Sequence, residues 1–211
     1  LRDTFFPHIH GRAFVQEAWR RGGAKAIDAL YEAPEKWPAS TEQILHPEKY
    51  FQRDRIDPPR EVPEVAEIQG TPTFQQDVLG EWMIYAWLAS YVGPAEARRA
   101  SEGWGGDRLA IAVKPGGLSS RLQTEWDTAR DAQEFAQALT KLFKVRLGKE
   151  ASFREGDPGT LIYERDDRRV SLRRMDRSVE LSEEMPCAFC TGSEMRKRAR
   201  PNTDGGQRPA R

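Results

Sequence analysis

The sequence contains few of the residue types that build metal centres. Its 211 residues include three histidines, His8, His10 and His46, and two cysteines, Cys187 and Cys190. A catalytic zinc site usually takes three protein ligands, often two of them from a His-Glu-x-x-His helix, and no such segment occurs in the sequence. We therefore expect no metal ligand in this chain, because the pair at His8 and His10 would need further ligands from elsewhere.

The two cysteines form one Cys-x-x-Cys segment, with no second pair to complete a zinc ribbon. A disulfide, a free dithiol and half of an intermolecular metal site all fit this spacing. The segment lies in residues 186–211, which are polar and rich in Gly, Pro and Arg. We expect this tail to be disordered, because such a composition buries too little apolar surface to fold.

Net charge and long apolar runs are also lacking. Acidic and basic residues number 33 each, so no global field favours nucleic acid or an anionic membrane surface. No apolar run approaches the roughly 20 residues of a membrane span. The sequence starts at Leu1 without a Met or a signal peptide, and we expect a fragment or a processed chain. We therefore expect no nucleic-acid partner and no membrane span in this chain, and the oligomeric state stays open.

Hydrophobic spacing predicts helices in the first half of the sequence. Apolar residues recur every three or four positions over residues 12–31, with Gly22-Gly23 as a weak middle. Four prolines within residues 58–72 predict an extended connector. Thr73 and Gln76 fit a capping box for a buried helix over residues 75–92, and a short polar helix follows over residues 95–102.

The spacing changes after residue 105. Alternation predicts strands at the five ranges 107–113, 121–126, 160–164, 169–174 and 178–182, and a clean apolar stripe predicts a helix over residues 128–147, capped by Asp127. The predicted fold class is α+β, with a helical N-terminal half followed by a small antiparallel sheet and one packed helix in the order β-β-α-β-β-β. The predicted domains are a helical part (1–105), a small α+β domain (106–185) and the tail (186–211).

The segment "STEQILHPEKY" at residues 40–50 holds the predicted catalytic residues. Ser40 and Gln43 fit a helix capping box, which needs no function. Glu42 and His46 are four residues apart, so on a helix they share a face, and the carboxylate would fix the tautomer of the imidazole and raise its pKa. Such a pair can act as an acid, a base or an oxyanion donor. The alternative is a capped turn without chemistry.

Two further segments have structural explanations. Glu81 lies in the apolar segment "VLGEWMIYAW", where an ionised carboxylate needs a partner; Arg108 or a Trp N–H is the expected partner, and a catalytic role is the alternative. The segment "GWGGDR" lies before a strand, which is the wrong order for a phosphate-binding loop. We interpret its glycines as a tight turn, with Trp104 in the core and Asp107 or Arg108 at the surface or in an ion pair.

Several segments together resemble the C-terminal part of a bacterial family of zincin-like proteins, related in layout to gluzincin metallopeptidases. The similarity covers roughly residues 5–182, with "STEQILHPEKY" as its most specific part. The other segments are "GRAFVQEAWRRGGAKAIDALYEAPEKWPASTEQILHPEKY", "LGEWMIYAWL", "GWGGDRLAIAV" and "TEWDTARDAQEFAQAL". His8 departs from the family pattern, which has an aromatic residue such as Tyr at this point.

The resemblance implies a hydrolase acting on a peptide or protein substrate. It also implies zinc in a longer parent protein, bound by an upstream His-Glu-x-x-His helix and a further Glu, with no zinc ligand in this chain. His46, oriented by Glu42, would then stabilise the oxyanion formed by attack of zinc-bound water.

Two hypotheses follow. The first is the C-terminal portion of a zinc metallopeptidase-like protein, which supplies cleft walls and a transition-state donor and is inactive alone. The alternative is a non-catalytic α+β interaction or scaffold protein.

Overall fold

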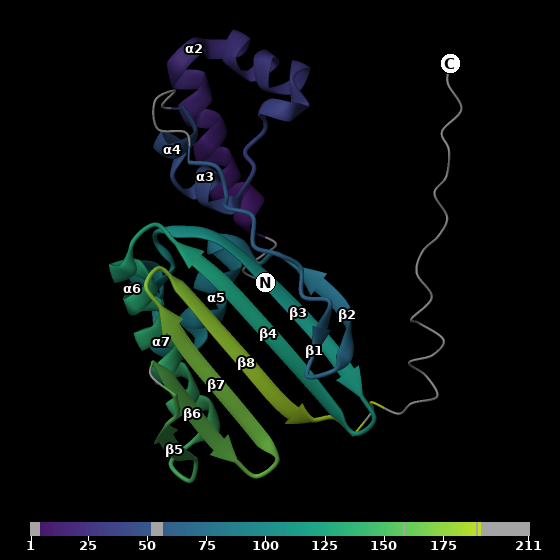
Figure 1. Cartoon of the computed structure of the whole chain (residues 1–211). Helices are drawn as coiled ribbons and strands as arrows, with labels where there is room; N and C mark the ends of the chain where they lie inside the picture. Colours follow the sequence, from purple (N-terminus) through teal and green to yellow (C-terminus); the bar gives the residue numbers. More distant parts are fainter. Residues whose placement is uncertain (1–4, 52–56, 158, 189, 191–211) are drawn as a thin grey trace, which may run out of the picture.

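The computed structural model describes residues 5–51, 57–157, 159–188 and 190. A helical arm, residues 5–51, stands at one end of an antiparallel sheet that carries helices on one face (Figure 1). The predicted α+β class, with helices first and an antiparallel sheet after them, is therefore confirmed. None of the helices within the described ranges is long and apolar enough to cross a membrane.

The sheet has eight strands in the order β1-β2-β3-β4-β8-β7-β6-β5, and all neighbours are antiparallel. The strands are β1 (Glu67–Ile68), β2 (Thr71–Asp77), β3 (Trp104–Lys114), β4 (Gly117–Trp126), β5 (Ser152–Glu155), β6 (Thr160–Arg165), β7 (Arg168–Met175) and β8 (Ser178–Pro186). The five predicted strands correspond to β3, β4, β6, β7 and β8. The other three were not predicted, and they extend the sheet at its two edges.

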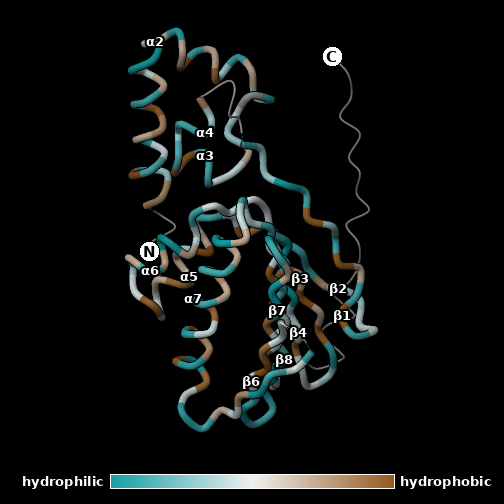
Figure 2. Tube along the Cα trace, turned by 60° about the vertical axis from the view of Figure 1, so that its left-hand side comes forward, coloured by the Kyte–Doolittle hydropathy of each residue, from teal (hydrophilic) through white to brown (hydrophobic). Residues whose placement is uncertain are grey.

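Helices α5 (Gly80–Val92) and α7 (Ala129–Leu147) cover one face of the sheet, and α6 (Pro94–Ser101) packs against both of them (Figure 2). The core between the layers contains fully buried Trp104, Trp126, Phe135 and Leu139, so the predicted place of Trp104 in the core is confirmed. The cap of α7 differs from the prediction. Thr128, not Asp127, is the N-cap, because the Thr128 hydroxyl accepts a hydrogen bond from the Asp131 backbone N–H at 3.2 Å.

The other face of the sheet is polar and is partly covered by the segment before β1. Buried Val65 of this segment and Ile68 of β1 pack against Ala110 and Ala112 of β3, whose small side chains let the segment lie close to the sheet. The segment forms no helix, in agreement with the predicted connector over residues 58–72. Only its end differs, because β1 and the start of β2 lie within that range.

The helical arm consists of η1 (Pro7–Gly11), α2 (Arg12–Glu32), η2 (Pro34–Lys36), α3 (Thr41–Leu45) and α4 (Pro47–Phe51). The predicted weak point of the first helix is a kink, where Gly23 has a positive φ of 60°. On the inner side of the arm, Phe14 packs against Tyr50 and Phe51 with ring centroids about 5 Å apart (5.1 and 5.0 Å). The arm therefore has a small aromatic core of its own.

The helix predicted over residues 75–92 begins later than expected, because residues 71–77 form β2 and pair with β3. Asp107 defines the actual start of α5: its carboxylate accepts the Leu79 and Gly80 backbone N–H groups, both at 2.8 Å. Asp107 is 2% exposed, so of the alternatives predicted for Asp107 and Arg108, a surface position for Asp107 is wrong. Gly80 has a φ of +71°, and a Cβ there would lie 2.6 Å from the Thr41 hydroxyl oxygen. The start of α5 is therefore set by the Asp107 hydrogen bonds and the turn at Gly80, and not by the predicted capping box at Thr73 and Gln76.

The Cys-x-x-Cys segment closes the end of the β3–β4 hairpin. Cys187 and Cys190 form a disulfide, which decides between the alternatives left open by the sequence. The Cys187 N–H donates to the Gly116 carbonyl and the Gly116 N–H donates to the Cys190 carbonyl, both at 3.0 Å. The remainder of the predicted disordered tail, residues 189 and 191–211, lies outside the described residues.

Candidate functional site

The predicted Glu42–His46 pair is not formed, although the capped turn around it is. Ser40 is the N-cap of α3, and its hydroxyl accepts from the Gln43 backbone N–H at 3.2 Å. The helix ends at Leu45, and His46 follows with non-helical φ and ψ of −122° and 73°. Two residues four apart share a face only while the helix continues. The side chains of Glu42 and His46 therefore separate and take different partners.

His46 bonds to Glu81 of α5. Its Nε2 lies 3.0 Å from Glu81 Oε1, which joins the arm to the body of the molecule. The Glu81 hydrogen bond raises the pKa of His46, and burial raises the pKa of Glu81, whose side chain is 4% exposed. Neither Arg108 nor a Trp N–H, the partners expected for Glu81, makes this bond.

The second nitrogen of the His46 ring also faces a carboxylate. Nδ1 lies 3.7 Å from Oε1 of the exposed Glu48. An imidazole between two carboxylates favours the doubly protonated cation, which has no lone pair with which to act as a base. This geometry fits a structural bridge, and the catalytic role of His46 and Glu42 stays a prediction.

A small cavity of about 60 Å³ adjoins this bridge. Its lining comes from the arm and from α5 and α6: His10, Leu45, His46, Glu81, Trp82, Tyr85, Arg98 and Ser101. Among the residues that the structure describes, Glu81 Oε2 has no hydrogen-bond partner, although the atom is buried. A buried carboxylate oxygen is normally satisfied, so this atom is the most informative feature of the cavity.

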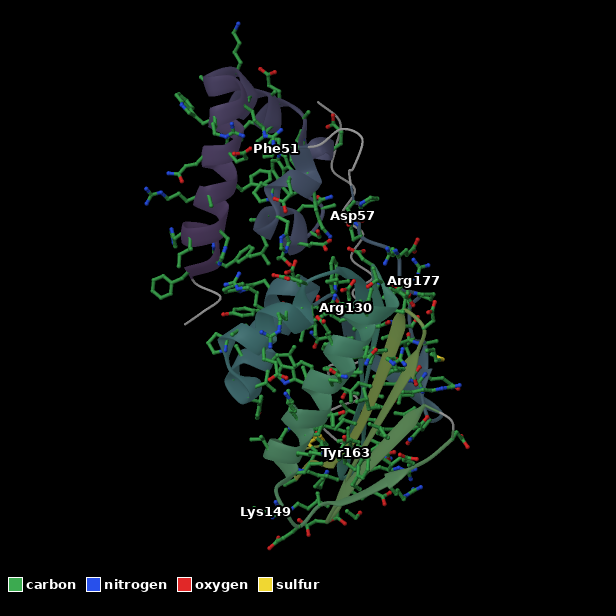
Figure 3. All side chains as sticks on the ribbon, turned by 90° about the vertical axis from the view of Figure 1, so that its left-hand side faces the viewer. Phe51, Asp57, Arg130, Lys149, Tyr163 and Arg177 are labelled. Atoms are coloured by element: carbon green, nitrogen blue, oxygen red, sulfur yellow. A yellow bond between two sulfur atoms is a disulfide. The ribbon has the colours of Figure 1, made fainter. Side chains whose placement is uncertain are left out.

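Glu42 belongs to a different cluster, centred on Lys49. The Lys49 ammonium donates to Glu42 at 2.7 Å, to Asp127 at 2.9 Å and to Asp57 at 3.0 Å, so all three of its N–H groups have a carboxylate partner. Asp57 lies where the arm joins the rest of the molecule, and Phe51 lies within the arm (Figure 3). Asp127 also accepts from Arg60 at 3.1 Å. These bonds connect the arm to the connector and to the end of β4.

The three carboxylates of this cluster resemble a cation site, and the cation is Lys49. One oxygen from each of Glu42, Asp57 and Asp127 lies within 4.8 Å of the other two. Burial raises the pKa of Glu42 to about 7, although Lys49 opposes the rise. Burial by itself lowers the pKa of Lys49, but its three carboxylate partners raise it above the ordinary value. Lys49 therefore stays charged and fills the place that a metal ion would need.

The outer surface of the arm is unusually apolar. Six of the thirteen large exposed hydrophobic side chains of the described residues fall within residues 5–37: Phe5, Ile9, Val15, Trp19, Tyr31 and Trp37. Val15 and Trp19 are 48% and 60% exposed and lie one helical turn apart. Arg12 and Gln16 are exposed on the same side of α2, and we call these four residues the arm face.

Sequence reasoning missed Lys49, Asp57, Asp127 and Arg98. Lys49 and Asp127 are 78 residues apart, so local spacing could not pair them. The one usable signal was Glu81, because a carboxylate in an apolar helix needs a partner. It was identified as a candidate, but its partner was not.

Comparisons with known proteins give a family but no activity. Residues 69–187 match the family model described as "Domain of unknown function (DUF8575)". A search among curated proteins finds no match. Among solved structures, the extracellular domain of PknH from Mycobacterium tuberculosis is 15% identical, with 59% of this chain and 75% of that chain covered and a TM-score of 0.33. A likeness at this level supports no conclusion about function.

The family match overturns the resemblance to gluzincin-type zincins, since no comparison points to a metallopeptidase. The segments that carried the resemblance are explained by the fold, because they form the arm, α5, β3 and α7. The inferred zinc site of a longer parent loses the resemblance on which it rested. The match covers strands β2 to β8 and helices α5 to α7, which includes Glu81 and Arg98 but not the arm. The chain belongs to the family described as Domain of unknown function (DUF8575).

Proposed function

We propose that the chain is a non-catalytic interaction protein whose arm face docks on a protein partner. The observation that carries the proposal is the composition of this face, where Val15 and Trp19 are about half exposed beside Arg12. Trp and Arg are the residues most enriched among the energetic centres of protein interfaces. Exposed apolar side chains gathered in one part of a structure mark interaction surfaces.

Charge defines the class of partner. Within the described residues Arg12 has no ion pair, whereas Arg20 and Arg21 are both paired with Glu17. Residues 12–21 thus carry three arginines and one glutamate, which is a net charge of +2. Two copies of the same basic face would repel each other. The fitting partner is a protein that offers an apolar groove with a carboxylate at its rim.

The bridge between arm and body supports this function by holding the arm in one orientation. Lys49 and His46 both connect the arm to the connector or the body through carboxylates, at distances of 2.9 to 3.0 Å. A preorganised surface loses less conformational entropy on binding than a mobile one. The polar bonds at the base of the arm therefore serve binding at its outer face.

A crosslinking experiment tests the proposal. A photoreactive amino acid replaces Trp19 in cells that make the chain, and the captured protein is then purified and titrated with the uncrosslinked chain. We expect one acidic partner, bound at least about thirtyfold more weakly by Trp19→Ser, since interface Trp residues typically contribute about 2 kcal/mol or more. Arg12→Ala should weaken binding as well. Val145→Ser is the matched control, because Val145 is 63% exposed but lies on α7.

Three results would contradict the proposal. The first is a partner bound equally well by Trp19→Ser and by Val145→Ser. The second is a dimer of the purified chain in sedimentation that Trp19→Ser dissociates, which would make a second copy the occupant. The third is Trp19-dependent binding to anionic vesicles without any protein partner.

A further inference from the structure

The cavity beside Glu81 has one unsatisfied acceptor and one unpaired cation at its wall. Glu81 Oε1 bonds to His46, and Oε2 has no donor in the described part of the chain although the Glu81 side chain is 96% buried (4% exposed). Arg98 of α6 also lines the cavity, and no carboxylate of the described residues pairs with it. The site therefore lacks one donor and one acceptor, which a single ligand could supply.

The walls of the cavity are flat and aromatic. The rings of His10 and Tyr85 both contact Trp82, with centroids 5.0 and 5.3 Å away, and the Arg98 guanidinium lies 5.7 Å from the centre of the Tyr85 ring. Aromatic walls favour a planar ligand, which can stack on the ring faces. Arg98 already occupies the cation position over Tyr85, which leaves the polar edge of its guanidinium for the ligand.

The volume of the cavity and the charges at its wall limit the ligands that it can bind. A water molecule occupies about 30 Å³ in the liquid, so 60 Å³ holds about two waters or a group of about four non-hydrogen atoms. Sugars, nucleotides and most amino acids are too large. A carboxylate would lie beside the Glu81 carboxylate, and an ammonium group would lie beside Arg98, so a charged group of either sign meets repulsion.

We propose that this cavity binds a primary carboxamide, whose N–H donates to Glu81 Oε2 and whose carbonyl accepts from Arg98. The carboxamide is planar and neutral, it carries donor and acceptor on one carbon, and with one methyl group it has four non-hydrogen atoms. It can be the end of an Asn or Gln side chain of a partner protein or a free small amide. The inference rests on the cavity and not on the arm face, so it stands or falls separately from the proposed function.

Nuclear magnetic resonance titration of the ¹⁵N-labelled chain tests the assignment. The probes are acetamide, acetate and methylammonium, which all fit the cavity volume and differ in charge, and blocked glutamine represents the amide of a protein side chain. We expect saturable shifts of the Trp82 indole N–H and of the Tyr85 and Arg98 amides with acetamide at millimolar concentration, the range of a four-atom ligand. Stronger shifts with blocked glutamine than with acetamide would identify a protein side chain as the source, and the reverse would identify a free amide.

Arg98→Ala and Arg99→Ala form a matched pair, because both side chains are exposed on the same helix and only Arg98 lines the cavity. Arg98→Ala should weaken acetamide binding at least about fivefold and Arg99→Ala should leave it unchanged. Glu81→Gln should also weaken it. Tighter binding of acetate or methylammonium, equal effects of the two arginine variants, or no saturable shift with any probe would overturn the assignment. The last result would mean that water alone occupies the cavity.

Discussion

Removing the cation of the three-carboxylate cluster is the most informative perturbation of this structure. Lys49→Met keeps most of the side-chain volume and deletes the ammonium that Glu42, Asp57 and Asp127 share. Glu42 is 1% exposed, so it cannot regain water. Breaking a buried ion pair by removing one partner typically costs about 3–5 kcal/mol.

The magnitude follows from the spacing of the oxygens. Two unit charges within 4.8 Å repel by about 3.5 kcal/mol at an effective dielectric constant of about 20. Asp57 and Asp127 are 33% and 24% exposed, so solvent reduces their part of this repulsion. We therefore expect Lys49→Met to lower the free energy of unfolding by about 3 kcal/mol at pH 8, measured by urea denaturation. At pH 5 the loss should be smaller, because Glu42, whose pKa is about 7 with Lys49 in place, takes up a proton.

Two controls sharpen the measurement. Lys141→Met removes an exposed ion pair with Glu96 and should cost less than about 1 kcal/mol. Calcium should partly restore Lys49→Met and not the parent chain, since three carboxylate oxygens at this spacing can surround an ion with metal–oxygen distances of about 2.4 Å. Equal losses for the two lysine variants, or a loss below about 1 kcal/mol at pH 8, would refute the reasoning.

Three further predictions concern pH, a turn and the core. The folded-state pKa values of Glu42 and His46 are raised, so the folded chain binds more protons than the unfolded chain between these pKa values and the ordinary ones. The free energy of unfolding should therefore fall by roughly 3 kcal/mol as the pH rises from about 4.5 to above 7. A flat pH profile in urea titrations would contradict both shifts. Gly80→Ala should cost about 1–3 kcal/mol, because φ is +71° and Thr41 blocks the Cβ, and a neutral change in thermal unfolding would show that the turn relaxes. Leu139→Ala in α7 should cost about 2–5 kcal/mol in the same assay, since Leu139 is fully buried, whereas a loss below about 1 kcal/mol would place α7 outside the main core.

The spacing of apolar residues predicted most of the helices and strands in which that spacing is regular. The helix over residues 128–147 matches α7 (Ala129–Leu147) closely, because its stripe of Ala132, Phe135 and Leu139 faces one core. The five alternating segments became strands for the same reason. β5 was missed because all four of its residues are exposed and show no alternation of burial.

The helix start at Gly80 could not be predicted from neighbouring residues. The sequence offered Thr73 and Gln76 as a cap, but Thr73 and Gln76 lie in β2, and Asp107, 27 residues after Gly80, supplies the hydrogen bonds that define the start. Capping by a side chain so distant in sequence leaves no local signal. The pairing of β2 with β3 and this long-range cap decide the boundary together.

The sequence by itself determined the α+β class, the capped turn at Ser40, the core position of Trp104 and the need of Glu81 for a partner, because each depends on local spacing or on the cost of burying one group. Only the tertiary structure decided which residues pair with His46, Glu42 and Glu81. His46 leaves the face of Glu42 because α3 ends at Leu45, and it then meets Glu81, 35 residues away. Glu42 meets Lys49 of α4 instead, because α3 ends between the two residues. Hydrogen bonds and charges act over a few ångströms of space, and spacing along the sequence does not report that distance.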